Sequence, residues 1–221
     1  VLVYDMLDQG YTPHMLSFNY GQRHKRELDF AAHTAFKLNL KHDIVDLKGI
    51  THLISNSALT TPITDDLYKE RKIEVPEGHY AEDSMKATVV PNRNMIMLSI
   101  AGGIAVNNKY RTIGMGVHGG DHFIYPDCRP TFIFSVGQAL LQGNEGFHNF
   151  TKDQLEEPII LGGRTFNSTA LPIFTPYLDK TKADIAYRGI ELKVPFETTW
   201  SCYKGGDLHC GRCGTCVERL E

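Results

Sequence analysis

Apolar residues along this chain gather in short runs that alternate with longer stretches of helical period. Residues 14–21 (HMLSFNYG) and 42–47 (HDIVDL) are short apolar runs typical of buried parallel strands. Between them, residues 23–40 place their apolar side chains on one face of an expected helix. Strand, helix and strand in this order favour a parallel sheet with helices packed on its faces. The pattern therefore predicts an α/β fold.

The same alternation extends over the rest of the chain, with one interruption. The further elements expected are helices at residues 1–8 and 131–141 and within residues 89–108 and 175–194, and a strand at residues 110–118. We expect Thr175 or Asp179 to cap the last helix, because both side chains can accept a hydrogen bond from a backbone amide. Residues 50–88 are polar and turn-rich, without a clear period. Such an insertion is a lid or substrate loop, or equally a surface loop without a ligand.

Composition limits the classes of protein that fit this pattern. The 221 residues are 42% hydrophobic and 22% charged, which suits one domain with a full core and a small appendage. The formal net charge of −3 provides no basic surface, so no direct nucleic-acid partner is expected. No stretch approaches the roughly 20 apolar residues of a membrane span, and the first residues do not resemble a signal peptide. These features predict a cytoplasmic protein.

Four of the five cysteines lie close together near the end of the chain, as Cys202-x7-Cys210-x2-Cys213-x2-Cys216. Thiolates at this spacing can converge on one tetrahedral ion, most commonly zinc. An iron–sulfur cluster and two disulfides are the alternatives, and a cytoplasmic location favours a metal over disulfides. Four protein thiolates leave no open position for a substrate, so the expected role of one Zn²⁺ is structural.

Glycines next to these cysteines indicate how the segment folds. Gly211 and Gly214 each follow a cysteine, where the chain must curl back so that amides can point at sulfur. We therefore predict a zinc-binding knuckle over residues 197–221, packed on an α/β domain over residues 1–196.

Polar clusters follow the expected strands or precede the expected helices, where ligands bind in open α/β sheets. The first cluster comes directly after a strand and contains Asn19, Tyr20, Gln22 and Arg23. An amide, an aromatic ring and a cation could together hold a nucleotide base and its phosphates. A polar helix start would have the same composition.

The second cluster, Pro91-Asn92-Arg93-Asn94, lies at the start of a buried helix. A helix N-terminus binds anions, and hydration explains poorly why an arginine precedes an apolar helix. We therefore favour phosphate binding by Arg93 and Asn94 over simple capping. Lys180 and Lys182 are further candidates for a phosphate contact, although most surface lysines are only hydrated.

The third cluster is the loop at residues 118–129 (HGGDHFIYPDCR), whose paired glycines allow a ligand to approach the backbone closely. Its candidate ligand side chains are His118, Asp121, Tyr125 and Asp127. Hydrogen-bond acceptors beside an aromatic ring suit a planar heterocycle. A metal site at His118, Asp121 and His122 is a less favoured alternative. Cys128 is expected to be a small buried residue rather than a nucleophile.

Taken together, five segments resemble the 7-cyano-7-deazaguanine synthase family of the queuosine pathway. They are FNYGQRHKRE, VVPNRNMIML, GVHGGDHFIYPDCRPTF, TKADI and TTWSCYKGGDLHCGRCGTCVER. The resemblance runs over nearly the whole chain. It implies a doubly wound, mostly parallel sheet of the adenine nucleotide alpha hydrolase-like type, within the PP-loop ATP-pyrophosphatase group. It also implies one zinc ion and a homodimer.

The activity implied by this resemblance is the ATP-dependent conversion of 7-carboxy-7-deazaguanine and ammonia into the nitrile, with Mg²⁺ accompanying ATP. An adenylated acid would accept ammonia to give an amide, and a second activation would remove the amide oxygen. The resemblance places the family's lysine at Lys182, with Lys180 as the second choice. Arg93 and Lys182 are expected to donate to the phosphate groups. From side-chain chemistry we expect the deazaguanine near Asp121, Tyr125 and Asp127, because a carboxylate can accept from the N–H groups of the base.

One family motif does not occur in the sequence. The family begins with a strand and a loop of the form S-G-G-x-D-S that cradles the ATP phosphates, whereas this sequence has no Ser-Gly-Gly run. We expect that Val1 lies in the helix after this loop, in a truncated or incompletely recorded enzyme. The alternatives are a catalytically impaired deazapurine-binding relative and another PP-loop enzyme, such as a tRNA sulfurtransferase, which would need an RNA-binding surface.

Overall fold

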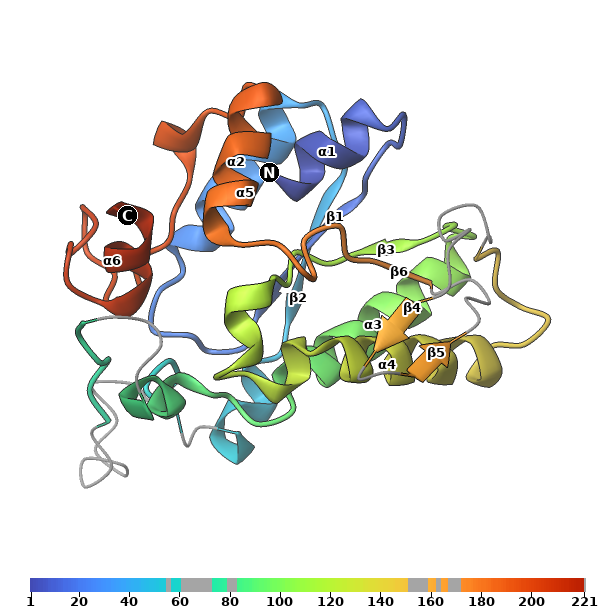
Figure 1. Ribbon diagram of the computed structural model, residues 1–221, viewed down its shortest axis with the longest axis horizontal. Helices are drawn as coiled ribbons and strands as arrows, with labels where there is room; N and C mark the ends of the chain where they lie inside the picture. The colour runs from blue at the N-terminus through green and yellow to red at the C-terminus, as the bar shows by residue number, and fades with distance from the viewer. Residues whose placement is uncertain are drawn as a thin grey trace. The chain divides into compact units, whose positions relative to one another are not determined.

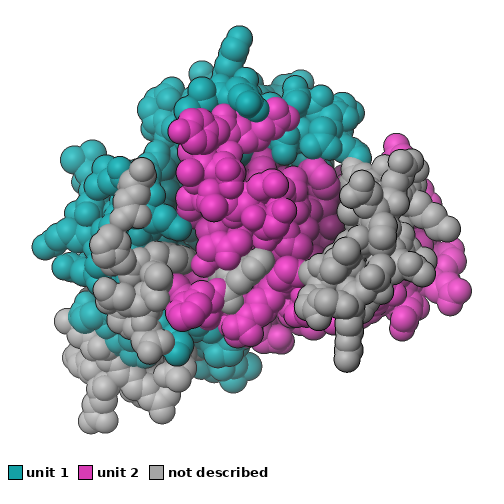
Figure 2. Space-filling model, viewed as in Figure 1, with its two compact units in different colours: residues 1, 3–91, 189–221 teal, residues 2, 92–188 magenta. Residues whose placement is uncertain are grey.

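The computed structural model describes residues 1–54, 57–60, 73–78, 83–150, 159–161, 164–166 and 172–220. By their internal contacts these residues fall into two compact units (Figure 2). Unit 1 comprises residues 1, 3–91 and 189–221, and unit 2 comprises residues 2 and 92–188. The cysteine-rich segment belongs to unit 1 by this measure, and the domain boundary expected after residue 196 stays a prediction.

Unit 1 contains a parallel strand pair linked by a helix (Figure 1). Strand β1 (Met15–Asn19) pairs with β2 (His42–Asp46) residue by residue, so that their carboxyl ends meet at one edge. Helix α2 (Arg26–Lys37) connects the strands and buries Leu28 and Ala35, which lie two turns apart on one face. This arrangement confirms the strand–helix–strand prediction.

The remaining elements of unit 1 are short. They are α1 (Leu2–Asp8), the 3₁₀ helices η1 (Lys48–Leu53), η3 (Asp83–Thr88) and η6 (Phe196–Thr198), and α6 (Gly214–Leu220). Helix α1 confirms the helix predicted at residues 1–8. Where the polar insertion at residues 50–88 is described, its only helices are 3₁₀ turns, as its lack of period indicated. Its role as a lid or substrate loop stays a prediction.

Unit 2 is built on two apolar helices, α3 (Arg93–Asn107) and α4 (Pro130–Gly143), which contact each other. Gly102 of α3 faces Leu140 of α4 so closely that a Cβ at Gly102 would lie 2.4 Å from Leu140 Cδ2. The missing side chain therefore allows the close approach of the two helices. Both helices confirm the sequence prediction.

Short strands complete unit 2. Strand β3 (Ile113–Gly114) pairs in parallel with β6 (Ile173–Phe174), and β4 (Ile159–Leu161) pairs antiparallel with β5 (Arg164–Phe166). The strand predicted over residues 110–118 is thus much shorter than expected. The antiparallel pair was not predicted, because three-residue strands are too short to show an alternation. The parallel pairs confirm a mixed α/β fold, while a doubly wound order of strands stays a prediction.

Helix α5 (Lys182–Glu191) begins later than the predicted caps, so the assignment of Thr175 or Asp179 was wrong. The Thr181 hydroxyl accepts a hydrogen bond from the Asp184 amide at 3.2 Å, and the Asp184 carboxylate accepts one from the Thr181 amide at 2.8 Å. This reciprocal pair is a capping box with aspartate in place of glutamate. The bond from the Thr181 amide also lowers the pKa of Asp184.

One stretch, Met85–Asn107, has the length and composition of a membrane span, with 23 residues and a mean hydropathy of 1.3. By length and composition it contradicts the expectation that no stretch approaches a membrane span. The stretch is not one regular helix, because η3 ends at Thr88 and Asn92 has a left-handed φ of 59° before α3 begins. The 15 residues of α3 extend over about 22 Å, less than the ~30 Å of a hydrocarbon core. The stretch is therefore weak evidence for a membrane helix.

Candidate metal centre and ligand-binding loops

The four clustered cysteines converge in the folded chain. Their Sγ atoms all lie within 4.8 Å of one another, and all four are free thiols in the structure. Cys202, Cys213 and Cys216 are buried, and Cys210 is half-buried. The predicted ligand set is therefore confirmed as a group positioned to bind one metal ion, and four thiolates are consistent with zinc.

A tight turn presents backbone amides to the Cys210 sulfur. Gly211 has a φ of 69°, which a residue with a Cβ rarely adopts. The amides of Arg212 and Cys213 then donate to Cys210 Sγ at 3.4 and 3.3 Å. Gly211 thus has the predicted role, whereas Gly214 does not have a positive φ and instead begins α6.

The electrostatics of the cluster fit a cation. Burial alone would raise the pKa of Cys213, but hydrogen bonds from Thr215 and from backbone amides lower it to about 6. Burial raises the pKa of Cys202 and of Cys216. The fold thus favours the thiolate of Cys213 and the thiols of Cys202 and Cys216. A divalent cation would supply the charge that favours thiolates at the last two.

The metal cluster packs against a distant part of the chain in unit 1. Ala58 and Val75 form a buried group with three of the cysteines. Glu77 forms an isolated antiparallel bridge with Cys213, and the Gly78 amide donates to the Arg212 carbonyl at 3.1 Å. Lys204 and Arg212 both form ion pairs with the Glu77 carboxylate. Residues 57–60 and 73–78 of the polar insertion are thus held against the knuckle.

The first predicted ligand cluster forms one loop after β1, but its polar groups bind within the protein. Tyr20 and Gln22 are buried. Gln22 Oε1 accepts from the Tyr20 amide at 2.9 Å, while Nε2 donates to the Phe18 carbonyl and to Glu27. Asn19 Oδ1 accepts from the Gly21 amide at 3.4 Å. These side chains therefore fold the loop, and a ligand role for Asn19, Tyr20 and Gln22 stays a prediction.

Arg23 likewise has protein partners. Its amide donates to the Leu59 carbonyl at 2.9 Å, and its guanidinium Nη2 donates to the Ile73 carbonyl at 2.7 Å. Arg23 thus connects the loop after β1 to residues 57–60 and 73–78 of the insertion. The sequence indicated a cation at this position but not that a carbonyl 50 residues away would bind it.

The second and third predicted clusters meet within unit 2. Asn94 is buried, and its backbone amide donates to Asp127 Oδ2 at 3.2 Å. Its side-chain Nδ2 donates to the Asp127 carbonyl and to Cys128 Sγ. An anion does lie at the start of α3, but it is the carboxylate of Asp127. Arg93 begins α3 and is half-buried. Cys128 is 4% exposed, which confirms the prediction of a small buried residue.

The rest of the 118–129 loop is anchored at its start. His118 is buried, and its Nδ1 accepts from the Gly120 amide at 3.1 Å. The Gly119 amide donates to the Lys180 carbonyl at 2.9 Å, so the loop after β3 contacts the residues before α5. Lys180 and Lys182 are both exposed. The side chains of Asp121 and His122, and with them the alternative metal site, lie outside what the structure describes.

The same loop exposes an aromatic ring that the sequence analysis did not select. Tyr125 is only 4% exposed, whereas Phe123 is 70% exposed. An exposed ring can stack on a ligand that approaches from solvent, and a ligand role for Tyr125 stays a prediction. The sequence around Phe123, between His122 and Ile124, does not show whether its ring is buried or exposed.

Comparisons with known proteins find a matching family model and several curated relatives. A family model described as Queuosine biosynthesis protein QueC matches residues 1–221. Curated relatives named 7-cyano-7-deazaguanine synthase, from Brucella ovis and from Brucella abortus, are each 49% identical over 207 residues, which is 94% of this chain and 76% of the relative. A relative of the same name from Rhizobium johnstonii is 48% identical over 207 residues, 94% of this chain and 75% of its own.

Proposed function

Because this chain belongs to the queuosine biosynthesis protein QueC family, we propose that it converts 7-carboxy-7-deazaguanine into 7-cyano-7-deazaguanine with ATP and ammonia. The observation that carries the proposal is 49% identity, over 94% of the chain, to relatives named for this product. The family model matches residues 1–221, a range that includes the loop at residues 118–129 and the four cysteines. The chain is thus an enzyme of queuosine biosynthesis, and the individual reaction steps are our proposal.

The chemistry requires two activations of one carbon atom. A carboxylate does not react with ammonia, so ATP first adenylates it and releases pyrophosphate. Ammonia then displaces AMP to give an amide. A second ATP adenylates the amide oxygen, and loss of AMP and protons leaves the nitrile. Each step develops negative charge on phosphate groups, which positioned cations stabilise.

Two cations at helix starts are our choice for this role. Arg93 begins α3 and Lys182 begins α5, and a helix N-terminus itself favours phosphate. Lys180 is the second choice, because its carbonyl is held by Gly119 while its side chain is exposed. Mg²⁺ would accompany the ATP phosphates, as is usual for nucleotides.

The remaining ligand contacts are proposed on residue chemistry. The residues that we propose to bind ATP or the deazaguanine are Asn19, Tyr20, Gln22, Arg23, Asn94, His118, Asp121, Tyr125 and Asp127. Carboxylates such as Asp121 and Asp127 can accept hydrogen bonds from the N–H groups of a guanine-like base. Several of the others also shape the loops, so their replacement should lower both ligand affinity and stability.

The surrounding architecture is proposed to be that of an adenine nucleotide alpha hydrolase-like fold. The parallel pairs β1–β2 and β3–β6, each carrying polar loops at its carboxyl end, support a doubly wound sheet. A structural Zn²⁺ on the four cysteines fits their burial. We further propose a cytoplasmic homodimer that does not bind nucleic acid directly, in keeping with the net charge of −3.

The direct test is product formation. Protein expressed from its complete gene is incubated with ATP, ¹⁵N-labelled ammonia and 7-carboxy-7-deazaguanine, and products are followed by mass spectrometry. We expect a nitrile that contains one ¹⁵N, together with AMP and pyrophosphate. Binding of the acid without AMP formation would indicate the catalytically impaired relative instead, and absence of both would contradict the proposed function.

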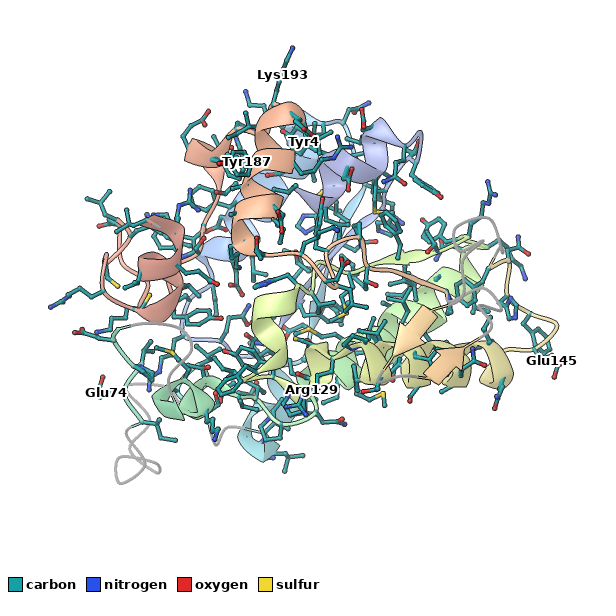
Figure 3. The ribbon with its side chains drawn as sticks, viewed as in Figure 1. Tyr4, Glu74, Arg129, Glu145, Tyr187 and Lys193 are labelled. Carbon is teal, nitrogen blue, oxygen red and sulfur yellow. The ribbon has the colours of Figure 1, made fainter. Side chains whose placement is uncertain are left out.

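A matched pair of lysine variants tests the assigned cation. Lys182→Ala should lower kcat/KM by about 100-fold or more, because a donor to transition-state charge is lost. Lys193→Ala is the control, since this exposed side chain lies beyond the other end of α5 and projects from the protein (Figure 3). Equal activity of the two variants would remove Lys182 from the mechanism without affecting the assignment of the reaction.

A further inference from the structure

The first turn of α2 is unusual for a helix start. None of the described side chains caps its N-terminus, and its first residue is Arg26. The Arg26 cation opposes the helix dipole at this end, whereas Glu27 and Asp29 in the same turn favour it. The contacts of Arg26 with the cysteine knuckle, which is also in unit 1, add stabilisation to a helix start that has no side-chain cap.

Arg26 contacts the spacer between the first two cysteines. Its guanidinium donates to the Asp207 carbonyl, and its Nη2 donates to Asp207 Oδ1 at 3.0 Å. The same guanidinium lies over the ring of Trp200, 5.2 Å from the centroid. An exposed ion pair by itself contributes little to stability. The cation–π contact with Trp200 and the hydrogen bond to the Asp207 carbonyl add to that contribution.

Trp200 connects α2 directly to the metal ligands. Its ring stacks on Phe30 of α2 at 5.6 Å and on His209 at 4.4 Å, and His209 precedes the ligand Cys210. Its Nε1 donates to the carbonyl of the ligand Cys202 at 3.1 Å. The only tryptophan of the sequence therefore lies between the helix and two of the four ligands.

The loop before α2 contacts the same spacer. A Cβ placed on Gly205 would lie 2.1 Å from Nδ1 of His24, so the imidazole lies against the glycine backbone. This packing requires Gly205, which also has a φ of 70°. His24 and Arg26 thus contact a segment whose two ends are Cys202 and Cys210, and Phe30 contacts Trp200 just before it.

We propose that a metal ion on the four cysteines positions the start of α2 and the loop before it, and that Arg26 and Trp200 are the positioning residues that transmit this effect. The ion joins Cys202 to Cys210 and so closes the spacer between them. Without the ion, thiols lack a common partner, and a small metal site of this kind loses its folded form. Asp207 and His209 then leave Arg26 and Trp200, and the uncapped helix start frays.

Arg23 extends the effect to residues proposed to bind ligand. It belongs to the loop that Gln22 and Asn19 fold, and it also binds Ile73, whose segment packs on the knuckle. Metal occupancy should therefore change ligand affinity, a consequence that rests on the proposed function. The effect of the metal on the start of α2 does not depend on that function, so the two are tested separately.

Hydrogen–deuterium exchange measures this dependence on the metal. The zinc-loaded protein is compared with protein treated with a chelator and a thiol reductant, over residues 22–32, 202–216 and, as a reference in unit 2, α4. Metal removal should speed exchange by about tenfold or more at both 22–32 and 202–216, with little change in α4. Faster exchange at 202–216 alone would overturn the proposal.

If the metal-free protein unfolds completely, two variants with the same charge change still test the proposal in the zinc-bound protein. Arg26→Glu places an acid in the first turn, which by itself favours the helix, but it removes the contacts with Asp207 and Trp200. Lys25→Glu makes the same change at the neighbouring exposed residue. With zinc bound, Arg26→Glu should speed exchange at 22–32 and Lys25→Glu should not. Equal or slower exchange in Arg26→Glu would overturn the proposal.

Trp200 provides a spectroscopic measurement and a functional one. Its fluorescence should shift to longer wavelength when zinc is removed from the natural protein. Arg26→Glu should already show part of this shift with zinc bound. If the proposed function holds, Arg26→Glu should raise KM for ATP about tenfold with kcat changed less than about twofold. An unchanged KM would limit the effect to structure, whereas unchanged fluorescence on zinc removal would contradict the positioning role.

Discussion

Asp127 and Gln22 are two polar residues whose types suggested ligands and whose partners are in the protein. The Asp127 carboxylate accepts from the backbone amide of Asn94 at the start of α3. The Gln22 side-chain amide makes three hydrogen bonds, with Tyr20 in its own loop, Phe18 of β1 and Glu27 of α2. Buried polar atoms without partners are costly, so such bonds stabilise the loops even without a ligand. A residue can therefore belong to a binding loop and still act on the ligand through loop shape.

His24 allows a test of loop burial by pH. Burial, together with the nearby Arg23 cation, lowers the pKa of His24 from 6.5 to about 4. Between these values the unfolded chain binds more protons than the folded one, so the free energy of unfolding decreases as pH falls from 6.5 toward 4. We expect the decrease to be smaller in His24→Gln, as measured by urea unfolding at several pH values.

The control for this prediction is His33→Gln, which changes an exposed histidine on α2. The free energy of unfolding of this variant should change with pH as in the natural protein, because the variant keeps His24 and all other groups on which the proteins are compared. If His24→Gln and His33→Gln showed the same pH dependence, the imidazole of His24 would not be kept neutral by the fold.

At the scale of elements, the contact between α3 and α4 depends on one small residue. Gly102 is buried and faces Leu140, whereas its neighbour Gly103 is exposed, with nothing within 4 Å of a Cβ placed there. The two glycines occupy the same helix and differ in what surrounds them. The sequence predicts the helix but does not show which of the two glycines faces α4, because both lie side by side in the same apolar stretch.

Alanine at these two positions should have opposite effects. Gly103→Ala is expected to raise the free energy of unfolding by up to about 1 kcal/mol, because alanine favours a helix over glycine. Gly102→Ala makes the same gain but forces Leu140 to move, and overpacking costs about 1–3 kcal/mol. Denaturant unfolding of both variants checks this. Equal stabilisation would mean that Leu140 relaxes without cost.

At the scale of the whole molecule, the metal site connects segments that are far apart in the chain. Residues 57–60, 73–78 and the start of α2 all contact the knuckle within unit 1. A domain of this size does not need a metal for its core, but a short cysteine-rich end does. The ion is thus expected to stabilise one region rather than the whole protein.

Metal analysis of two cysteine variants tests this assignment. The natural protein should contain one zinc per chain, and Cys216→Ser should lose most of it, because a neutral hydroxyl replaces a thiolate ligand. Cys128→Ala should keep one zinc, since Cys128 is the one cysteine outside the cluster. Metal content should fall as pH decreases, because protonated thiols do not bind zinc. Iron with visible absorbance would contradict the choice of metal.

Much of the architecture could be predicted because its signals are local. The strand–helix–strand start, the helices at α3 and α4, and the four cysteine ligands follow from periodicity and spacing within about twenty residues. The predictions failed where local signals compete or are too short. Thr175, Asp179 and Thr181 are all possible caps, and only the backbone path selects Thr181. The three-residue strands β4 and β5 carry no readable alternation.

The sequence by itself determined the family, the mixed α/β class and the identity of the metal ligands, because each depends on residue types at fixed short spacings. Only the tertiary structure decided that Asp127 occupies the start of α3, that Tyr125 is buried while Phe123 is exposed, and that the knuckle supports α2. These contacts join residues 33 to 181 positions apart. The packing of the folded chain decides which of many possible polar partners meet. No short stretch of sequence contains this information.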